Sequence, residues 1–337
     1  MSAMTRTTAL RTGLVAAAAA GAVGLGVLVA PAGAGPSPAL PPVAAEDLVG
    51  SVLTADPPAF GGTAEVVNAL GLPPLPGLSD PAALGDAVRT ARVWSDGEGR
   101  GRVSLPSRGS EQTLVADGDT LWSYESSTRT ATAHEHGALP ARPTVADPAA
   151  AARALLDAVR PTSSLAVDGT GEVAGRPVYD LVLTPAPTER TLLREIRVSV
   201  DSATRMPLRL DVLTNGATEP ALRVGFTELS VEPQDPELFR FTPPEGVTVE
   251  QAEAPHGFAP LASATADGPV RLVGDGWDTV ALGTVPVEAL ELVKQVGEPT
   301  AGGWVVNSAV GTVLVTSDGR VAAGAVPQQV LAEALAR

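Results

Sequence analysis

The clearest pattern along the chain is an alternation of apolar and polar residues in short segments separated by turn residues. Alternation with a period of two places the apolar side chains on one face of a strand, so each segment predicts a half-buried β-strand. Asp96-Gly97 and Asn215-Gly216 are typical of hairpin turns between such strands. The predicted strands are 61–67, 87–95, 100–105, 113–116, 120–125, 128–134, 164–168, 178–184, 193–201, 207–213 and 221–231.

Two segments with helical spacing interrupt this pattern. Residues 44–54 place their leucines and valines on one side, which predicts a short helix. A second helix is expected over residues 147–159, because Asp147 suits the N-cap and Pro148 suits the first helical position. The apolar side of this second helix consists of Leu155, Leu156 and Val159. The order predicted is therefore a β-meander, a helix and a second β-meander.

A smaller unit is expected at the C-terminal end. A Pro-rich segment over 232–246 closes the second meander, and residues 250–269 have the composition of a linker. The pattern then predicts a strand near 277–282, a helix over 286–296, a hairpin over 304–325 and a helix over 327–336. The expected organisation is a signal segment 1–34, a Pro-rich linker 35–43, a large domain 44–255 and a C-terminal appendage 256–337.

The first residues have the composition of an export signal. Arg6 and Arg11 form a basic region, residues 14–30 are apolar and uncharged, and Ala32-Gly33-Ala34 matches the small-residue pattern of a cleavage site. The alternative is an uncleaved anchor formed by residues 14–30. Either interpretation places the rest of the chain outside the cytoplasmic membrane, in the cell-wall space or secreted.

Composition excludes several kinds of site. The chain has no cysteine, so it has no disulfide, thiolate metal site or cysteine nucleophile. Its formal net charge of −15 disfavours nucleic acid as a partner, because phosphate backbones are repelled. With 44% hydrophobic residues the chain can still bury a full core.

No motif for catalysis, a cofactor or a metal ion emerges from the sequence. His134 and His136 would share a face of a strand, but no third ligand cluster stands near them. Glycines at 169, 171 and 175 are expected to form a hairpin turn, since no helix follows that could hold a phosphate. A nucleophile–base pair is likewise missing. We therefore expect a protein that is not an enzyme and carries no cofactor.

Aromatic residues are rare, at 3% of the chain, so their positions are informative. Trp122 and Tyr124 lie two positions apart on one predicted strand and share a face, and Trp94 belongs to an earlier strand. They either fill an ordinary core or line a ligand cavity.

In the order and residue pattern of several segments, the chain resembles actinobacterial LolA-like proteins, within the wider group of LolA, LppX and RseB folds. The resemblance covers roughly residues 44–250. The segments that carry it are 94–97, 102–105, 115–118, 121–124, 173–183, 200–201 and 204–209.

This resemblance implies a half-open antiparallel β-barrel whose concave face is covered by helices, here 44–54 and 147–159. In the family that concavity accepts acyl chains of lipids or lipoproteins, and the apolar loop over 68–81 would lie near its mouth. The expected cavity residues are Trp94, Trp122, Tyr124, Leu155, Leu156, Val159, Tyr179 and Leu181.

Two functions follow from the resemblance. The first is a non-catalytic carrier that holds the acyl chain of a lipid or lipoprotein. The second is an RseB-like regulatory sensor that binds an anti-sigma factor or another membrane protein. RseB-like proteins also carry a domain after the half-barrel, and residues 257–337 could correspond to it.

Overall fold

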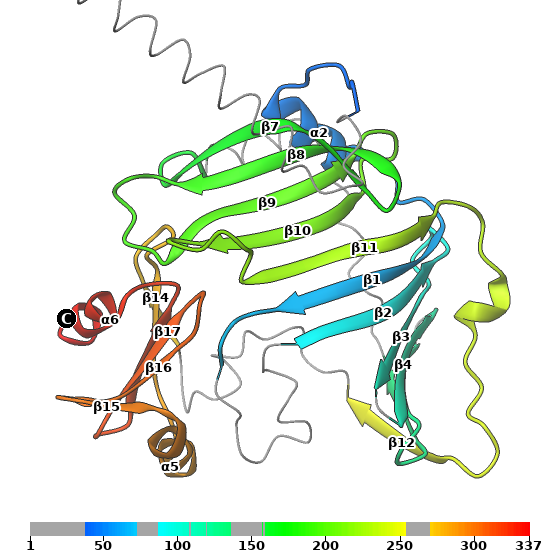
Figure 1. The fold of residues 1–337 in the computed structure, drawn as a ribbon. Coiled ribbons are helices and arrows are strands. Elements are labelled where there is room, and N and C mark those ends of the chain that lie inside the picture. The colour runs from blue at the N-terminus through cyan, green and yellow to red at the C-terminus, as the bar shows by residue number, and fades with distance from the viewer. Residues whose placement is uncertain are drawn as a thin grey trace, which may run out of the picture. The chain divides into compact units, whose positions relative to one another are not determined.

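Twelve strands form one large sheet that is not closed into a barrel (Figure 1). The computed structural model describes residues 38–72, 87–107, 109–118, 120–135, 157, 159–253 and 270–337. The strand order is β12-β6-β5-β4-β3-β2-β1-β11-β10-β9-β8-β7, so β12 and β7 are the edges. The strands are β1 Phe60–Asn68, β2 Ala87–Ser95, β3 Gly101–Ser107, β4 Ser110–Asp117, β5 Thr120–Glu125, β6 Thr130–Glu135, β7 Ser163–Val173, β8 Arg176–Pro185, β9 Leu193–Asp201, β10 Pro207–Thr214, β11 Leu222–Ser230 and β12 Thr248–Glu253.

The fold predicted from the alternating pattern is confirmed. The chain is mainly β, its large sheet is open, and neighbouring strands up to β11 pair in antiparallel fashion. β2, β5 and β9 begin and end at the residues that the alternation predicts. β1 and β11 join the two meanders, because β1 pairs with β2 on one side and with β11 on the other.

Two predictions from the sequence are wrong in part. Residues 250–253 were expected at the start of a linker, but they belong to β12, which pairs in parallel with β6. The turn between β7 and β8 consists of Ala174 and Gly175, with φ of 50° and 75°, which are values of a type I′ turn. Gly169 instead lies at an irregularity within β7, where its φ of 88° suits a β-bulge.

Two short helical segments accompany the large sheet. Helix α2 (Ala45–Thr54) confirms the first predicted helix. The acidic side chains of Glu46 and Asp47 in its first turn stabilise it, because they lie at the positive end of the helix dipole. The 3₁₀ helix η2 (Pro236–Phe239) lies in the Pro-rich closing segment and is capped by the Asp235 carboxylate, which accepts from the Glu237 amide. Most of the predicted helix 147–159 and of the loop 68–81 lies outside the described residues.

The C-terminal residues form a second, six-stranded sheet with its own core, as expected for a small α/β unit. Its order is β13-β14-β18-β17-β16-β15. Leu331, Val280 and Ala322 are almost fully buried between this sheet and helix α6. The elements are β13 Arg271–Val273, β14 Val280–Thr284, α5 Val287–Val296, β15 Glu298–Thr300, β16 Gly303–Asn307, β17 Thr312–Thr316, β18 Arg320–Gly324 and α6 Gln328–Leu335.

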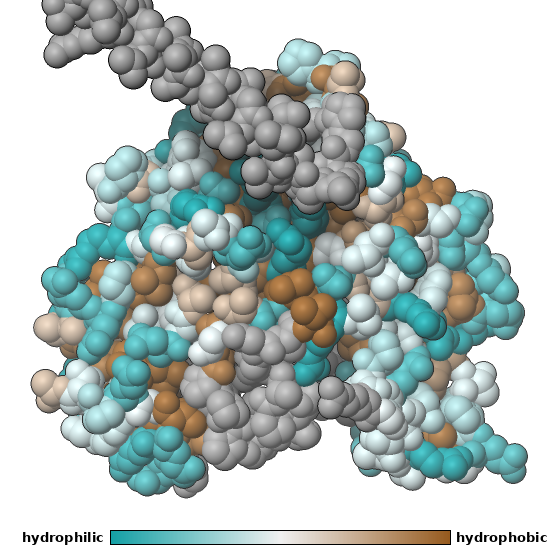
Figure 2. All heavy atoms as spheres, viewed as in Figure 1, coloured by the Kyte–Doolittle hydropathy of each residue, from teal (hydrophilic) through white to brown (hydrophobic). Residues whose placement is uncertain are grey.

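The two sheets belong to one unit, Leu40–Arg337. The Trp277 indole Nε1 donates to Ser163 Oγ over 2.6 Å, and the Leu192 amide donates to the Ala325 carbonyl over 2.8 Å. On the face seen in Figure 2, hydrophobic residues form small groups between hydrophilic ones. The domain boundary expected at residue 255 stays a prediction.

Candidate ligand-binding face

One face of the large sheet, here called the α2 face, carries the apolar residues of β8 and β9 against which α2 packs. Leu48 of α2, Tyr179 of β8 and Val200 of β9 are buried together in one core. The Tyr179 hydroxyl donates a hydrogen bond of 3.0 Å to the Pro41 carbonyl oxygen. Tyr179 therefore fills a packed core beneath α2 and has only 5% of its surface exposed.

Beyond α2 the same face continues as an apolar surface across five strands. The register places directly opposed residues on the same face, and two rows follow from it. Eight of these nine side chains are half-buried, and Val224 is exposed at 37%. The rows consist of Leu181, Val198, Leu210, Val224 and Val66, and of Leu183, Ile196, Val212 and Leu222.

The opposite face of these strands carries ion pairs beside apolar side chains that are already buried, among them Val178 and Val182 of β8. Arg197 Nη2 donates to Asp168 over 3.0 Å and to Glu195 over 3.3 Å. Arg223 Nε donates to Asp211 over 2.6 Å on the neighbouring strands. The rows of half-exposed apolar side chains thus lie on the α2 face, whereas the opposite face combines buried valines with charged groups that are costly to desolvate.

The expected cavity residues fall into two groups on opposite faces. Directly opposed residues share a face of a sheet. A series of such pairs runs from Leu181 through β9, β10, β11 and β1 to Arg89 of β2, so Arg89 lies on the α2 face. Arg89 and Trp94 are an odd number of positions apart on β2, so their side chains point to opposite faces. Trp94 shares its face with Trp122 through the opposed pairs of β3 and β4.

The group on the second face is covered by the closing segment. The Phe241 ring lies 5.2 Å from the Trp122 ring and 5.9 Å from the Tyr124 ring, measured between centroids. Phe239, fully buried, precedes it at the end of η2. Trp122 and Tyr124 therefore pack against their own chain, while Tyr179 and Leu181 belong to the α2 face.

The remaining expected residues lie on the second predicted helix. Leu155 and Leu156 lie outside the described residues. Val159 is helical and half-buried, and its carbonyl oxygen accepts a hydrogen bond of 3.1 Å from the Thr162 amide. Their assignment to a cavity stays a prediction.

A buried ion pair stabilises the turn between β9 and β10. Asp201, fully buried, accepts from Arg176 Nε over 2.6 Å and from the Thr204 amide over 2.6 Å. Burial opposes ionisation of this carboxyl, but the hydrogen bonds from Arg176 and Thr204 outweigh it and lower the pKa of Asp201. The pair orients the turn that carries Arg205, whose guanidinium carbon lies 5.5 Å from the centre of the Tyr179 ring.

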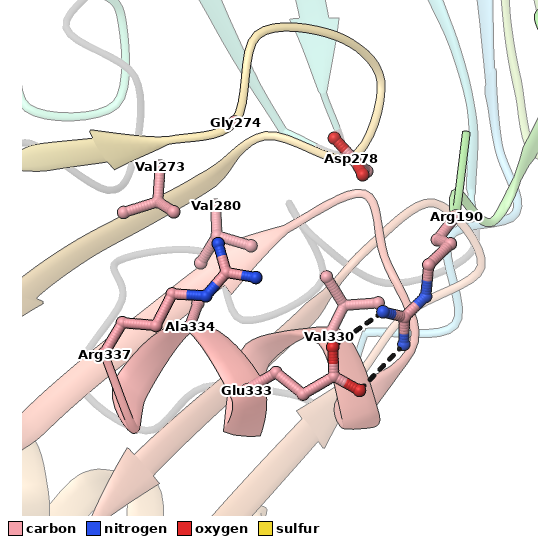
Figure 3. A pocket seen from close by; sticks show the side chains of 9 residues that line it. All are labelled: Arg190, Val273, Gly274, Asp278, Val280, Val330, Glu333, Ala334 and Arg337. Atoms are coloured by element: carbon pink, nitrogen blue, oxygen red, sulfur yellow. Dashed lines mark hydrogen bonds and ion pairs between the residues drawn. The ribbon is translucent and has the colours of Figure 1, made fainter. Parts of the chain in front are cut away.

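Two pockets lie at the C-terminal unit. In the smaller, of about 80 Å³, the Arg190 guanidinium donates two hydrogen bonds of 2.6 and 3.1 Å to the Glu333 carboxylate (Figure 3). The hydrogen bond from Arg190 lowers the pKa of Glu333. The larger, of about 380 Å³, is lined by three arginines and two leucines. Arg337 lines both pockets.

In the part of the chain that the structure describes, no three His, Asp or Glu side chains are gathered as a metal ion would require. His134 lies on β6, whereas His136 and His256 lie outside the described residues. None of the described helices is long and apolar enough to cross a bilayer.

Sequence reasoning missed three contributors to these surfaces. Val66 and Val224 reach the α2 face only because β1 and β11 pair with each other, which local alternation does not reveal. Phe241 was read only as part of the Pro-rich closing segment, yet it covers Trp122. The rarity of aromatic residues in the chain was the signal that could have connected Phe241 with Trp122.

Solved structures similar to this chain include MucB and a LolA superfamily protein. MucB in complex with MucA(peri) is 20% identical, with 86% of this chain and 96% of that chain covered and a TM-score of 0.46. The Pseudomonas aeruginosa MucA/MucB complex is 19% identical over 86% of this chain and 96% of that chain, with a TM-score of 0.45. A LolA superfamily protein from Nitrosomonas europaea is 12% identical over 59% and 99% of the two chains, with a TM-score of 0.25. No protein-family model and no curated protein matches the chain in sequence.

Proposed function

We propose that this protein is a non-catalytic carrier outside the cytoplasm that holds acyl chains of lipids or lipoproteins on its α2 face. The observation that supports the proposal is the pair of apolar rows across β8, β9, β10, β11 and β1, in which no side chain is fully buried. Contiguous apolar surface that a folded chain leaves half-exposed is typical of a binding site.

An acyl chain suits this surface because both are extended and apolar. Each methylene group that leaves water for such a surface contributes about 0.8 kcal/mol, so a long chain could bind without any specific polar contact. The opposite face is less suited to an acyl chain, since Arg197 and Asp211 on it would lose water without gaining a partner. Export through residues 1–34 is part of this proposal.

Native mass spectrometry of the protein exported from its own type of host tests this function. We expect a stoichiometric adduct, and extraction should identify it as a molecule with an acyl chain. A protein that is free of ligand after gentle purification, and that also takes up no acyl compound when one is supplied, would contradict the carrier function.

A second candidate is the RseB-like sensor, which the C-terminal unit favours. This unit has its own core and contacts the large sheet through Trp277 and Ala325, whereas a surface for one acyl chain needs only the large sheet. The test is binding to the extracytoplasmic domain of a membrane protein encoded beside this chain. Binding that is lost when residues 270–337 are removed, in a truncated form shown to stay folded, would favour the sensor.

A further inference from the structure

The larger pocket of the C-terminal unit combines positive charge with an apolar floor. Arg271, Arg320 and Arg337 line it together with Leu282 and Leu335, and no Asp or Glu is among its lining residues. The chain as a whole has a net charge of −15, so three arginines around one cavity differ sharply from its average surface.

The sheet register explains why these residues meet. Arg271 of β13 is directly opposite Leu282 of β14, and Arg320 of β18 is directly opposite Thr284 of β14. Leu282 and Thr284 are two positions apart, so all four side chains share one face. α6 packs on that face through Leu331 and ends at Leu335 beside the pocket.

Two of the arginines differ in how much of their hydrogen-bonding capacity remains. Arg320 Nη1 donates to the Leu335 carbonyl at the end of α6, and its Nε donates to Asp318 over 3.0 Å. Arg271 is exposed and makes no hydrogen bond or ion pair within the described residues. Arg271 therefore has all its donors available to a ligand.

We propose that this pocket binds a phosphate monoester group that is attached to a small apolar moiety, as in phosphatidic acid. Guanidinium groups match the oxygens of phosphate through paired hydrogen bonds, and a doubly charged group suits several arginines better than a single carboxylate. The volume of about 380 Å³ lies in the range of small-molecule sites, and Leu282 and Leu335 offer apolar contact beside the charges.

The overall negative charge does not prevent such binding. At physiological ionic strength charges are screened beyond about 8 Å, so distant acidic residues contribute little to the pocket. Nearby, Asp318 pairs with Arg320, and among the described residues Arg271 keeps an unpaired charge. This site is separate from the α2 face, and its existence does not depend on the acyl-carrier function.

Titration calorimetry on the full protein with dihexanoyl phosphatidic acid and with inorganic phosphate tests this inference. Arg271→Gln should weaken binding of phosphatidic acid at least about tenfold, as expected for lost charge-assisted hydrogen bonds. The control is Arg92→Gln, which removes the same charge from an exposed residue of β2. It should leave the affinity unchanged.

The two probes distinguish the source of the phosphate. Inorganic phosphate that binds much more weakly than phosphatidic acid identifies a lipid headgroup, and equal affinities identify free phosphate as the ligand. The inference is overturned if neither probe binds the unmodified protein. It is also overturned if Arg271→Gln and Arg92→Gln weaken binding alike, since that would reflect net charge alone.

Discussion

The Tyr179 hydroxyl donates a hydrogen bond to the carbonyl oxygen of Pro41, which lies 138 positions earlier in the chain. The bond ties the segment that leads into α2 to the middle of β8. Tyr179→Phe removes this hydrogen bond and keeps the buried ring, so we expect the free energy of unfolding to fall by about 1 kcal/mol. Urea denaturation of the unmodified protein and of the variant measures this difference in the free energy of unfolding.

Tyr124→Phe is the matched control, because the Tyr124 hydroxyl makes no hydrogen bond within the described residues. This change should alter the free energy of unfolding by less than about 0.5 kcal/mol. Equal effects of the two substitutions would show that the bond to Pro41 does not stabilise the protein.

Leu48 should be the residue through which α2 is held on the sheet. It is fully buried against Tyr179 and Val200, whereas Leu53 on the same helix is 42% exposed. We expect Leu48→Ala to lower the free energy of unfolding by about 3 kcal/mol and Leu53→Ala by less than about 0.5 kcal/mol. Thermal unfolding of both variants checks the difference, and similar losses would mean that α2 is not anchored by this core.

Acid should destabilise the protein partly through Asp201. The pKa of this carboxyl is lowered in the folded state, so its contribution is complete above the ordinary value of 3.8 and is lost as the pH falls through the lowered value. Asp201→Asn should cost about 3 kcal/mol at pH 7, because Arg176 loses its buried partner. It should also make the loss of stability below about pH 4 shallower.

Urea denaturation over a series of pH values measures both effects. Asp56→Asn, at an exposed carboxylate before β1, serves as the control and should change neither. An Asp201→Asn protein whose stability falls as steeply in acid as that of the unmodified protein would contradict this role.

The fold could be predicted from the sequence where local pattern and turn chemistry agree. β9 was predicted to its end residues because Ile196, Val198 and Val200 alternate with polar residues and a turn follows. β12 was missed for the opposite reason. It is a polar edge strand whose Val249 is 51% exposed, and its partner β6 lies far earlier in the chain. Pairing between distant segments leaves no local signal.

The candidate site could be predicted only in part. Alternation shows that Tyr179 and Leu181 share a face, and that Trp122 and Tyr124 share a face. Whether these two faces coincide depends on the register across β11 and β1, and that register puts them on opposite sides. A list of apolar and aromatic residues therefore could not define one cavity without the pairing of the strands.

The proposed carrier function requires that the α2 face, and not the sheet in general, hold acyl chains. Val224 and Val88 allow a matched comparison, because both are exposed valines of the same sheet and lie on opposite faces. A charged side chain at Val224 would have to be desolvated by a bound acyl chain, whereas one at Val88 would remain in water.

The most direct measurement is the affinity of a fluorescent fatty-acyl probe for the unmodified protein and for the Val224→Glu and Val88→Glu variants, with folding checked by circular dichroism. We expect the probe to bind the unmodified protein and Val88→Glu alike, and Val224→Glu at least about tenfold more weakly. A probe that binds none of the three, or binds both folded variants equally well, would contradict the assignment of the α2 face.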